Sequence, residues 1–228
     1  PVPYAPAPGG AGLYFYAERA GSPYTSENAY WLAARRGTTM ASTNGAPTFA
    51  GPSASFTDTV HAEVDRYPLP TFFHDPEADF YAWDYLYAGS PGDDVRTYTT
   101  TLRGVAGTGT PTLTVRLQGG SDTDAPNEHR VRIRWNGNDL GDATWDGIAP
   151  WVATFPLGPT DVVEGTNTLV LTAILEPGLG YDVVYVDSFD VSYPRLYRAV
   201  DEELSFTVPA GAEAAVSGFG SQSVILLD

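Results

Sequence analysis

Apolar and polar residues alternate along the middle of the chain with a period of two. The alternation is clearest in residues 111–118, 129–135 and 168–173. It predicts half-buried strands of an antiparallel sheet. Trp135 falls on the apolar side of its strand, and we therefore expect it in the core. On the same grounds, further strands are expected near residues 12–18, 29–34, 59–66, 79–87, 96–104, 151–157, 182–193, 203–208, 213–219 and 223–227.

Turn-forming residues interrupt the chain at short intervals. It contains 24 glycines and 19 prolines, which break any helix before it reaches an average length. The segment Asn136-Gly137-Asn138-Asp139 indicates a tight hairpin, since Asn and Gly tolerate the positive φ angles that such turns need. Many short strands joined by turns predict an all-β fold with the architecture of an antiparallel β-sandwich.

The 228 residues suffice for one large all-β domain. Residues 1–12, rich in Pro, Ala and Gly, are expected to form a flexible leader, and residues 13–228 one β-sandwich domain. Within that domain we expect a compact core at about residues 70–195, with flanking strands in 13–66 and 196–228. No turn signal follows the last apolar run, so we expect the chain to be part of a longer protein.

Charge and composition exclude several classes of function. The 12 basic and 28 acidic residues give a net charge of −16 (12 − 28), which repels phosphate backbones and anionic lipids. No nucleic acid and no membrane is expected as a partner. The chain has neither Cys nor Lys, which excludes thiol nucleophiles, disulfides, thiolate metal sites and lysine chemistry. It also lacks a nucleophile motif, and we expect it to be no enzyme.

The segment 121–128, between two predicted strands, is rich in side-chain oxygens. Asp122, Asp124, Asn127 and Glu128 lie within one turn, and clusters of hard oxygen ligands suit calcium. The segment lacks the Gly and Glu spacing of an EF-hand. A solvated loop is the simpler interpretation, and a calcium site formed by these four residues is the alternative. No other cofactor is expected.

Other polar residues have structural explanations. The three histidines, His61, His74 and His129, form no close pair, and we expect ordinary edge or turn residues. The carboxylates are numerous, but their spacing selects no pair for glycoside hydrolysis. Asp187 shares the parity of its apolar neighbours, so we expect a buried carboxylate with a structural role, held by hydrogen bonds or an ion partner. The alternative is a bulge that turns it outward.

Two sets of side chains invite a ligand. Arg116 and the three arginines of residues 130–134 would share one face if their strands pair. We expect acidic side chains to neutralise this stripe, and binding of an anionic or sugar ligand is the alternative. Trp83, Trp145 and Trp151 lie near strand ends, where their flat faces are candidates for contact with a sugar ring.

Five segments resemble a known family, in order, through nearly the whole chain. They are residues 13–16, 24–32, 129–147, 164–169 and 186–193. Together they resemble the all-β region that precedes the catalytic domain in gingipain-type cysteine peptidases. The stretch Tyr-Thr-x-x-Asn-x-Tyr-Trp-Leu is the most distinctive part. The Gly-x-Asn-x-Leu and final-strand motifs also occur in many jelly rolls of the carbohydrate-binding-module type.

The resemblance implies a secreted, multidomain protein, extracellular or at the cell surface, with a peptidase domain after Asp228. It implies an antiparallel β-sandwich of jelly-roll, carbohydrate-binding-module type with extra flanking strands. The function would be that of a non-catalytic accessory or pro-like module, which aids the folding, docking or substrate access of the adjacent peptidase domain. The alternative is a carbohydrate-binding module with a polysaccharide partner. No catalytic residue is carried over, because the family's Cys and His belong to the later domain.

Overall fold

The chain divides into two compact units. In the computed structural model, the first unit comprises Pro1–Ala50, Asp75–Asp79 and Ser221–Asp228, and the second, which we call the sandwich unit, comprises Gly51–His74 and Phe80–Gly220. The structure describes residues 2–7, 10, 12–17, 27–41, 54–72, 79–123, 125–209, 212–221, 224 and 226.

Strands make up the regular structure of both units. They are β1 (Tyr4–Pro6), β2 (Leu13–Phe15), β3 (Ser55–Glu63), β4 (Tyr67–Pro68), β5 (Tyr81–Ala82), β6 (Asp84–Ala88), β7 (Val95–Leu102), β8 (Thr112–Gly119), β9 (His129–Trp135), β10 (Asn138–Trp145), β11 (Pro150–Pro156), β12 (Gly165–Ala173) and β13 (Asp182–Leu196). Within the described ranges, no helix is long and apolar enough to cross a membrane.

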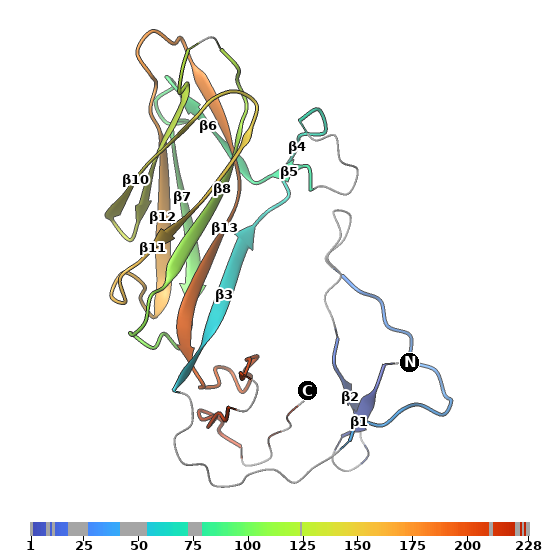
Figure 1. The fold of residues 1–228 in the computed structure, drawn as a ribbon. Helices are drawn as coiled ribbons and strands as arrows, with labels where there is room; N and C mark the ends of the chain where they lie inside the picture. Colours follow the sequence, from blue (N-terminus) through green and yellow to red (C-terminus); the bar gives the residue numbers. More distant parts are fainter. Residues whose placement is uncertain are drawn as a thin grey trace. The chain divides into compact units, whose positions relative to one another are not determined.

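Two antiparallel sheets form the sandwich unit (Figure 1). One sheet has the order β10-β9-β12-β7, and the other has the order β11-β8-β13-β3. The long strand β13 pairs with β6 along its first residues and with β3 along the rest of the same edge. The small sheet β4-β5 lies outside these two. The predicted fold class, an all-β antiparallel sandwich of jelly-roll type, is confirmed.

The core lies between the two sheets and consists of the inward-facing residues of their strands. Trp135 is fully buried, as predicted, and its Nε1 donates a hydrogen bond to the carbonyl oxygen of Asp161 at 2.9 Å. Phe189 of β13 meets the Trp135 ring edge-on, with the ring centroids 6.5 Å apart. The Asp161 carbonyl thus satisfies the one polar atom of the large Trp135 side chain.

The hairpin between β9 and β10 has the predicted tight turn. Asn136 and Gly137 both have positive φ, 48° and 85°, and Trp135 pairs directly with Asn138. This two-residue turn matches the twist of the flanking strands, which fixes their register. Buried Asn167 accepts a hydrogen bond from the Asn136 side chain at 2.8 Å and so ties the turn to β12.

A bulge in β13 resolves the position of Asp187. The pairing of β13 with β8 shifts register between Val186 and Ser188, so residues 184 and 186 face inward before the bulge and Phe189 after it. Asp187 is thereby turned out of the core, and its Oδ2 accepts a hydrogen bond from Ser188 Oγ at 3.1 Å. The expected buried position of Asp187 is therefore wrong, and the alternative, a bulge that turns it outward, is what forms.

The expected stripe of four arginines does not form, because β8 and β9 belong to opposite sheets and do not pair. Arg130 and Arg132 both bind the carboxylate of Asp142 on β10, at 2.6 and 2.8 Å. Arg116 instead pairs with Asp190 on the other sheet, at 2.7 Å. The expected neutralisation by acidic side chains across the sheet is confirmed.

The first unit contains a short ribbon. β1 pairs antiparallel with β2, and the backbone of Tyr4 in β1 also exchanges hydrogen bonds with Thr38 and Met40 on its other side. β1 lies within residues 1–12, the segment that was predicted to be a flexible leader.

Several predicted strands are wrong. Residues 29–34 and 203–208, all of which the structure describes, contain no strand, and residues 213–219 contribute isolated bridges alone. The residue pattern predicted these strands, but a strand also needs a partner strand to satisfy its backbone groups. The predicted strand at 223–227 falls largely outside the described residues.

Candidate functional site

A cluster of buried polar residues lies at one end of the sandwich unit. The loop between β8 and β9 carries Ser121 and Glu128, β9 begins with His129, and β13 begins with Asp182. Because β8 and β9 belong to opposite sheets, the loop must cross from one sheet to the other, and this crossing carries Glu128 inward. Ser121, Glu128, His129 and Asp182 are 8, 1, 0 and 0% exposed.

His129 donates a hydrogen bond from each of its two ring nitrogens. Nδ1 lies 2.6 Å from Asp182 Oδ1, and Nε2 lies 3.0 Å from the carbonyl oxygen of Gly147. A carbonyl and a carboxylate both accept hydrogen bonds, so this geometry favours the cationic ring, in which both nitrogens carry protons. Burial opposes that charge, but the hydrogen bond and charge of Asp182, followed by the Gly147 carbonyl and Glu128, outweigh it and raise the pKa of His129.

Ser121, His129 and Asp182 have the residue types of a hydrolase triad in a different order. Ser121 Oγ donates a hydrogen bond to Asp182 Oδ1 at 2.9 Å, and Asp182 Oδ1 also accepts a hydrogen bond from His129 Nδ1. In a catalytic triad the histidine stands between the other two residues and takes the proton of the serine. Here the aspartate stands in the middle, and His129 Nε2 is bound to a backbone carbonyl, so the geometry activates no nucleophile.

Two oxygens of this cluster have no hydrogen-bond partner. Glu128 Oε1 accepts from the backbone N–H of Gly147 at 2.7 Å, but Oε2 is buried and unpartnered. Asp182 Oδ2 is likewise buried and unpartnered. An unsatisfied buried carboxylate oxygen is costly, because the oxygen has lost its hydration without replacement.

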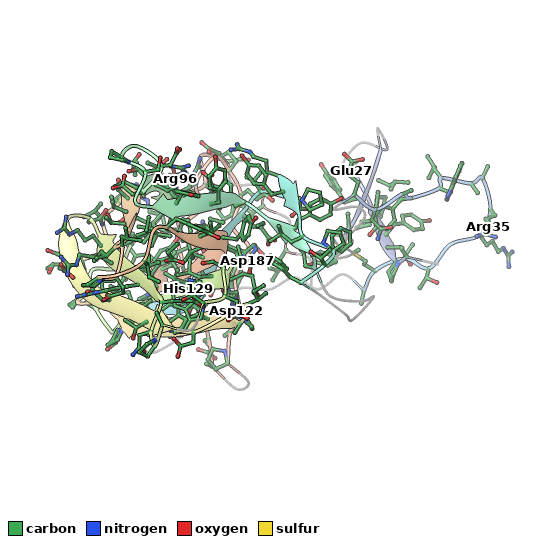
Figure 2. All side chains as sticks on the ribbon, turned by 90° about the horizontal axis from the view of Figure 1, so that it is seen from above. Glu27, Arg35, Arg96, Asp122, His129 and Asp187 are labelled. Carbon is green, nitrogen blue, oxygen red and sulfur yellow. The ribbon has the colours of Figure 1, made fainter. Side chains whose placement is uncertain are left out.

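The predicted calcium residues divide between the interior and the surface. Glu128 is buried, whereas Asp122 (Figure 2) and Asn127 are exposed, and Asn127 adopts a left-handed φ of 52°. Asp124 lies outside the described residues. The assignment of these four residues as calcium ligands therefore stays a prediction.

Gly119 allows the His129 ring to approach the backbone. A Cβ at this position would lie 2.1 Å from the carbonyl oxygen of Gly147 and 2.5 Å from His129 Nε2. Both distances are far below van der Waals contact, and one of them involves rigid backbone. Glycine is therefore required where β8 passes the buried histidine.

The three predicted ligand tryptophans lie at two places. The rings of Trp145 and Trp151 stack with centroids 5.8 Å apart, and Trp145 also contacts the ring of His129 at 4.8 Å. Trp83 packs elsewhere, against Tyr98 at 4.5 Å. All three are partly buried and pack against the core. Sugar contact by any of them stays a prediction.

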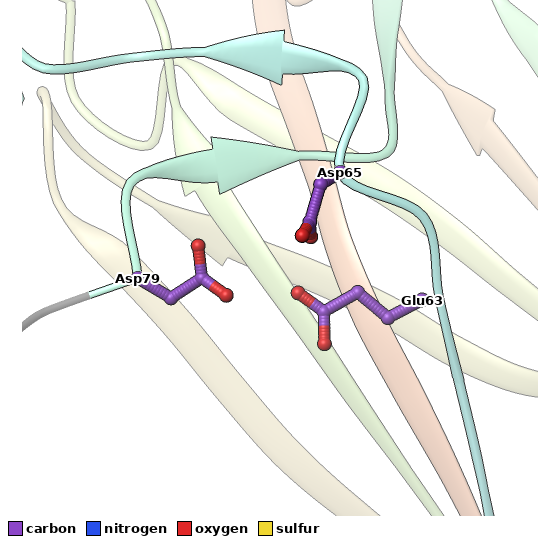
Figure 3. A group of neighbouring side chains, drawn as sticks. All are labelled: Glu63, Asp65 and Asp79. Atoms are coloured by element: carbon purple, nitrogen blue, oxygen red, sulfur yellow. The ribbon is translucent and has the colours of Figure 1, made fainter. Parts of the chain in front are cut away.

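Two further acidic residues lie close to each other in the sequence: Glu63 is the last residue of β3, and Asp65 follows just after it (Figure 3). Asp79, also drawn there, belongs to the first unit. Glu63 is bound by His61 Nε2 at 2.7 Å, and His61 Nδ1 binds Asp190 at 2.6 Å. Burial lowers the pKa of His61, but its two carboxylate partners outweigh that and raise it.

The sequence interpretation of His129 as an edge or turn residue is wrong. His129 shares the inward parity of Val131 and Ile133, and this period-two pattern is the signal that could have placed it inside. Its partner Asp182 lies 53 residues away along the chain. No local pattern connects the two residues, so the pair itself could not be read from the sequence.

No family model and no curated protein matches this chain. Among solved structures, dimeric latent PorU from Porphyromonas gingivalis is similar over 68% of this chain, with 12% identity and a TM-score of 0.48. This chain spans 14% of the length of that PorU chain.

Two carbohydrate-binding modules are also among the solved structures found to be similar. The CBM36-1 domain of a multidomain xylanase from the hindgut metagenome of Trinervitermes trinervoides covers 59% of this chain and matches over 95% of its own length, with 18% identity and a TM-score of 0.37. A CBM36 module in complex with calcium and xylotriose covers 59% of this chain and matches over 98% of its own length, with 19% identity and a TM-score of 0.34. These likenesses concern the fold and carry no function over to this chain.

Proposed function

We propose that this chain is a non-catalytic accessory module that docks onto a gingipain-like cysteine peptidase domain of the same secreted protein. The docking element is the aromatic surface, defined here as residues 13–16 and 30–32 of the first unit. Docking here would aid the folding of the peptidase domain or control access to it. The protein would act outside the cell or at its surface.

The observation that carries this proposal is the exposure of the aromatic surface. Trp31 is 94% exposed, Leu32 85% and Tyr16 62%. Water-exposed apolar side chains of this size, gathered in two short segments, mark surfaces that bind another protein. Large aromatic residues of this kind also supply most of the binding energy in protein interfaces.

The ribbon itself offers these side chains little cover. Phe15 and Tyr30 contact each other with ring centroids 5.1 Å apart, yet both are still more than a third exposed. A two-stranded ribbon has no second layer against which its side chains can pack. A partner that supplies the missing apolar layer would therefore stabilise the ribbon as it binds.

A non-catalytic role is supported by how the polar groups of the sandwich unit are used. The Ser121, Asp182 and His129 side chains are bound to one another in an order that activates no serine. The whole sequence has no Cys to serve as a peptidase nucleophile. The isolated chain is accordingly expected to leave Arg- and Lys-containing peptides and polysaccharides uncleaved.

The test measures binding between this chain and the separately expressed peptidase domain of the same protein by calorimetry. We expect the double substitution Trp31→Ser and Leu32→Ser to weaken binding by about a hundredfold or more, since each residue lies within the aromatic surface. The control is Val152→Ser, which removes a 58% exposed apolar residue from β11 of the sandwich unit.

Two outcomes would overturn the docking proposal. One is equal affinity of the double variant and the unmodified chain. The other is a loss with Val152→Ser as large as with the double variant, which would place the interface on the sandwich. Circular dichroism of each variant establishes that its fold is kept before binding is compared.

Carbohydrate binding is a second candidate, favoured by the stacked rings of Trp145 and Trp151. Two neighbouring aromatic rings can pack against consecutive sugar units, although here both rings also pack against the core. Affinity electrophoresis in gels that contain xylan, β-glucan or starch tests it. Retardation that Trp151→Ala abolishes would favour this candidate, and unchanged mobility in all three gels would remove it.

A further inference from the structure

We propose that the peptide bond after Arg35 or Arg36 is a processing site for an arginine-specific endopeptidase, and that a cut there separates the aromatic surface from the sandwich unit. We call these two residues the arginine pair. The cut itself does not depend on the docking function proposed above. Its consequence, the loss of a docking surface, rests on that function.

The arginine pair lies in a continuously exposed segment. Residues 27–39, all of which the structure describes, are exposed throughout and contain no helix and no strand apart from an isolated bridge at Thr39. Figure 2 shows Arg35 at the turn of its loop, with the side chain directed away from the loop. Exposed segments without regular structure are the preferred sites of proteolytic cleavage, because an endopeptidase must take several residues of its substrate into its active site.

Both guanidinium groups are accessible to an enzyme. In the part of the chain that the structure describes, neither Arg35 nor Arg36 forms an ion pair, whereas strand arginines such as Arg96 and Arg130 bind carboxylates. A peptidase that selects arginine binds the guanidinium to a carboxylate at the base of a pocket. The arginine pair can enter such a pocket without first giving up a carboxylate of its own chain.

The other exposed arginines that the structure describes are Arg66, Arg103, Arg134 and Arg198. Arg134 lies within β9, and the N–H of Arg103 donates to the hydroxyl of Tyr193 at 3.2 Å. The Arg66 N–H donates to the carbonyl oxygen of Ala82 at 3.1 Å. The buried residue after Arg198 donates its N–H to the carbonyl oxygen of Ser217 at 2.7 Å. Each of these arginines is tied to another element, which must open before a peptidase can act.

The backbone at the arginine pair is held more loosely. The Arg35 N–H donates to the carbonyl oxygen of Ala33 at 2.9 Å, which closes a local turn and makes no tie to another element. After the pair, Gly37 packs against the ring of Tyr4, and a Cβ at this position would lie 2.9 Å from a ring carbon. Local opening at the pair therefore disturbs the edge of a short ribbon and no packed core.

A cut at the arginine pair separates the two functional parts of the chain. Water adds across the peptide bond, so the arginine gains a carboxylate and the next residue gains a free amino group. Residues 13–16 and 30–32 precede the pair, and every residue of the sandwich unit follows it. One hydrolysis thus removes the whole aromatic surface from the covalent chain that carries the sandwich unit.

Few contacts would hold the two fragments together after the cut. In the described part of the first unit, two backbone hydrogen bonds join residues before the pair to residues after it. The Tyr4 N–H donates to the carbonyl oxygen of Thr38 at 3.0 Å, and the Met40 N–H donates to the carbonyl oxygen of Tyr4 at 2.8 Å. Two hydrogen bonds are too weak to offset the entropy that the fragment gains on leaving, so we expect it to dissociate.

The experiment digests the isolated chain with a low concentration of trypsin. The chain has no Lys, so trypsin cuts it only after arginine. Mass spectrometry and N-terminal sequencing at successive times identify the first cut, and we expect the new N-terminus to be Arg36 or Gly37. Arg35→Gln combined with Arg36→Gln should slow the first cut by about tenfold or more. The control is Arg66→Gln, which removes an exposed arginine of the sandwich unit and should leave the rate unchanged.

Size-exclusion chromatography of the cut chain tests the release, and the N-terminal fragment should elute separately. The proposal is overturned if the first cut follows an arginine outside the pair, including Arg19, which lies outside the described residues. It is also overturned if the double variant is cut as fast as the unmodified chain, or if the two fragments elute together. No measurement here uses the peptidase domain, so the result decides the processing site whether or not the chain docks onto that domain.

Discussion

Trp135 and Trp31 show the same side chain in opposite surroundings. Trp135, in the sandwich unit, is fully buried and donates its N–H to the Asp161 carbonyl. Trp31, in the first unit, is 94% exposed. The contrast extends to their neighbours, because the sandwich buries nearly every inward-facing apolar residue while the first unit leaves residues 13–16 and 30–32 in water.

The difference teaches what buries an aromatic residue. The residue must lie in a strand with alternating apolar and polar positions, and that strand must pair with another strand on each side. Trp135 lies in β9, which pairs with both β10 and β12. Trp31 lies in a described segment without strand structure. Aromatic content alone therefore predicts an apolar surface, and pairing decides whether that surface becomes core or interface.

Removing Trp135 tests the buried side of this comparison and has the largest expected effect. Trp135→Ala should lower the free energy of unfolding by about 3 to 5 kcal/mol, the range for large aromatic deletions in cores. The loss has two sources, the cavity left between the sheets and the hydrogen bond from Trp135 to the Asp161 carbonyl, which keeps its second donor, Asn136 Nδ2, at 2.8 Å. Urea melts measure it. A loss below about 1 kcal/mol would mean that the interior repacks freely, against the close packing argued here.

The buried His129 gives the sandwich unit a pH dependence. Its pKa is raised above the ordinary 6.5 of the unfolded chain, so its stabilisation is complete below pH 6.5 and is lost as pH rises through the folded-state pKa. The free energy of unfolding should fall there with a slope of at most about 1.4 kcal/mol per pH unit for this one proton.

His61 also has a raised pKa, so the measurement is made in a His61→Gln background. Urea melts at several pH values from 5.5 to 9 then report His129 alone among the described histidines. His129→Gln should remove the remaining slope. A slope that persists in the double variant, or stability that rises with pH over this range, would contradict the assignment of a buried imidazolium.

The surface ion pairs of β9 and β10 should matter much less. Arg132, followed by Arg130, holds the pKa of the Asp142 carboxyl below its ordinary value, although burial of the carboxyl opposes this. Both arginines are about a third exposed, so solvent screens the interaction. Asp142→Asn should cost about 0.5 to 1 kcal/mol, and the cost should shrink in 0.5 M salt. A cost that does not change with salt would indicate that Asp142 acts by packing.

Period-two patterns predicted much of the sandwich from sequence. Residues 129–135 were predicted as a strand with the bounds that β9 has, and the Asn136-Gly137 turn follows from the conformations that those two residues tolerate. The bulge that turns Asp187 outward could not be predicted from the sequence, because a bulge depends on how β13 pairs with β8. The apolar segment 29–34 was misread as a strand, since its sequence does not tell whether a partner strand is present.

The candidate site was less predictable, because its contacts join distant parts of the chain. Glu128 was singled out as an oxygen ligand, but its burial depends on the loop crossing between sheets. Asp182 reaches His129 through the topology of β13, and Asp146 reaches Glu128 through the turn after β10. Arg116 was grouped with the wrong strand for the same reason, since local patterns give strands and not their neighbours.

Trp31→Ala has the smallest expected effect and sharpens the comparison most directly. In the isolated chain it should change the free energy of unfolding by less than about 0.5 kcal/mol, as exposed substitutions usually do. The reason is that a side chain already in water gives up no burial when it is removed. Urea melts of Trp31→Ala and Trp135→Ala under the same conditions measure the contrast. A loss with Trp31→Ala above about 1.5 kcal/mol would mean that Trp31 is covered in solution, and the aromatic surface would then be part of a core rather than a surface kept for a partner.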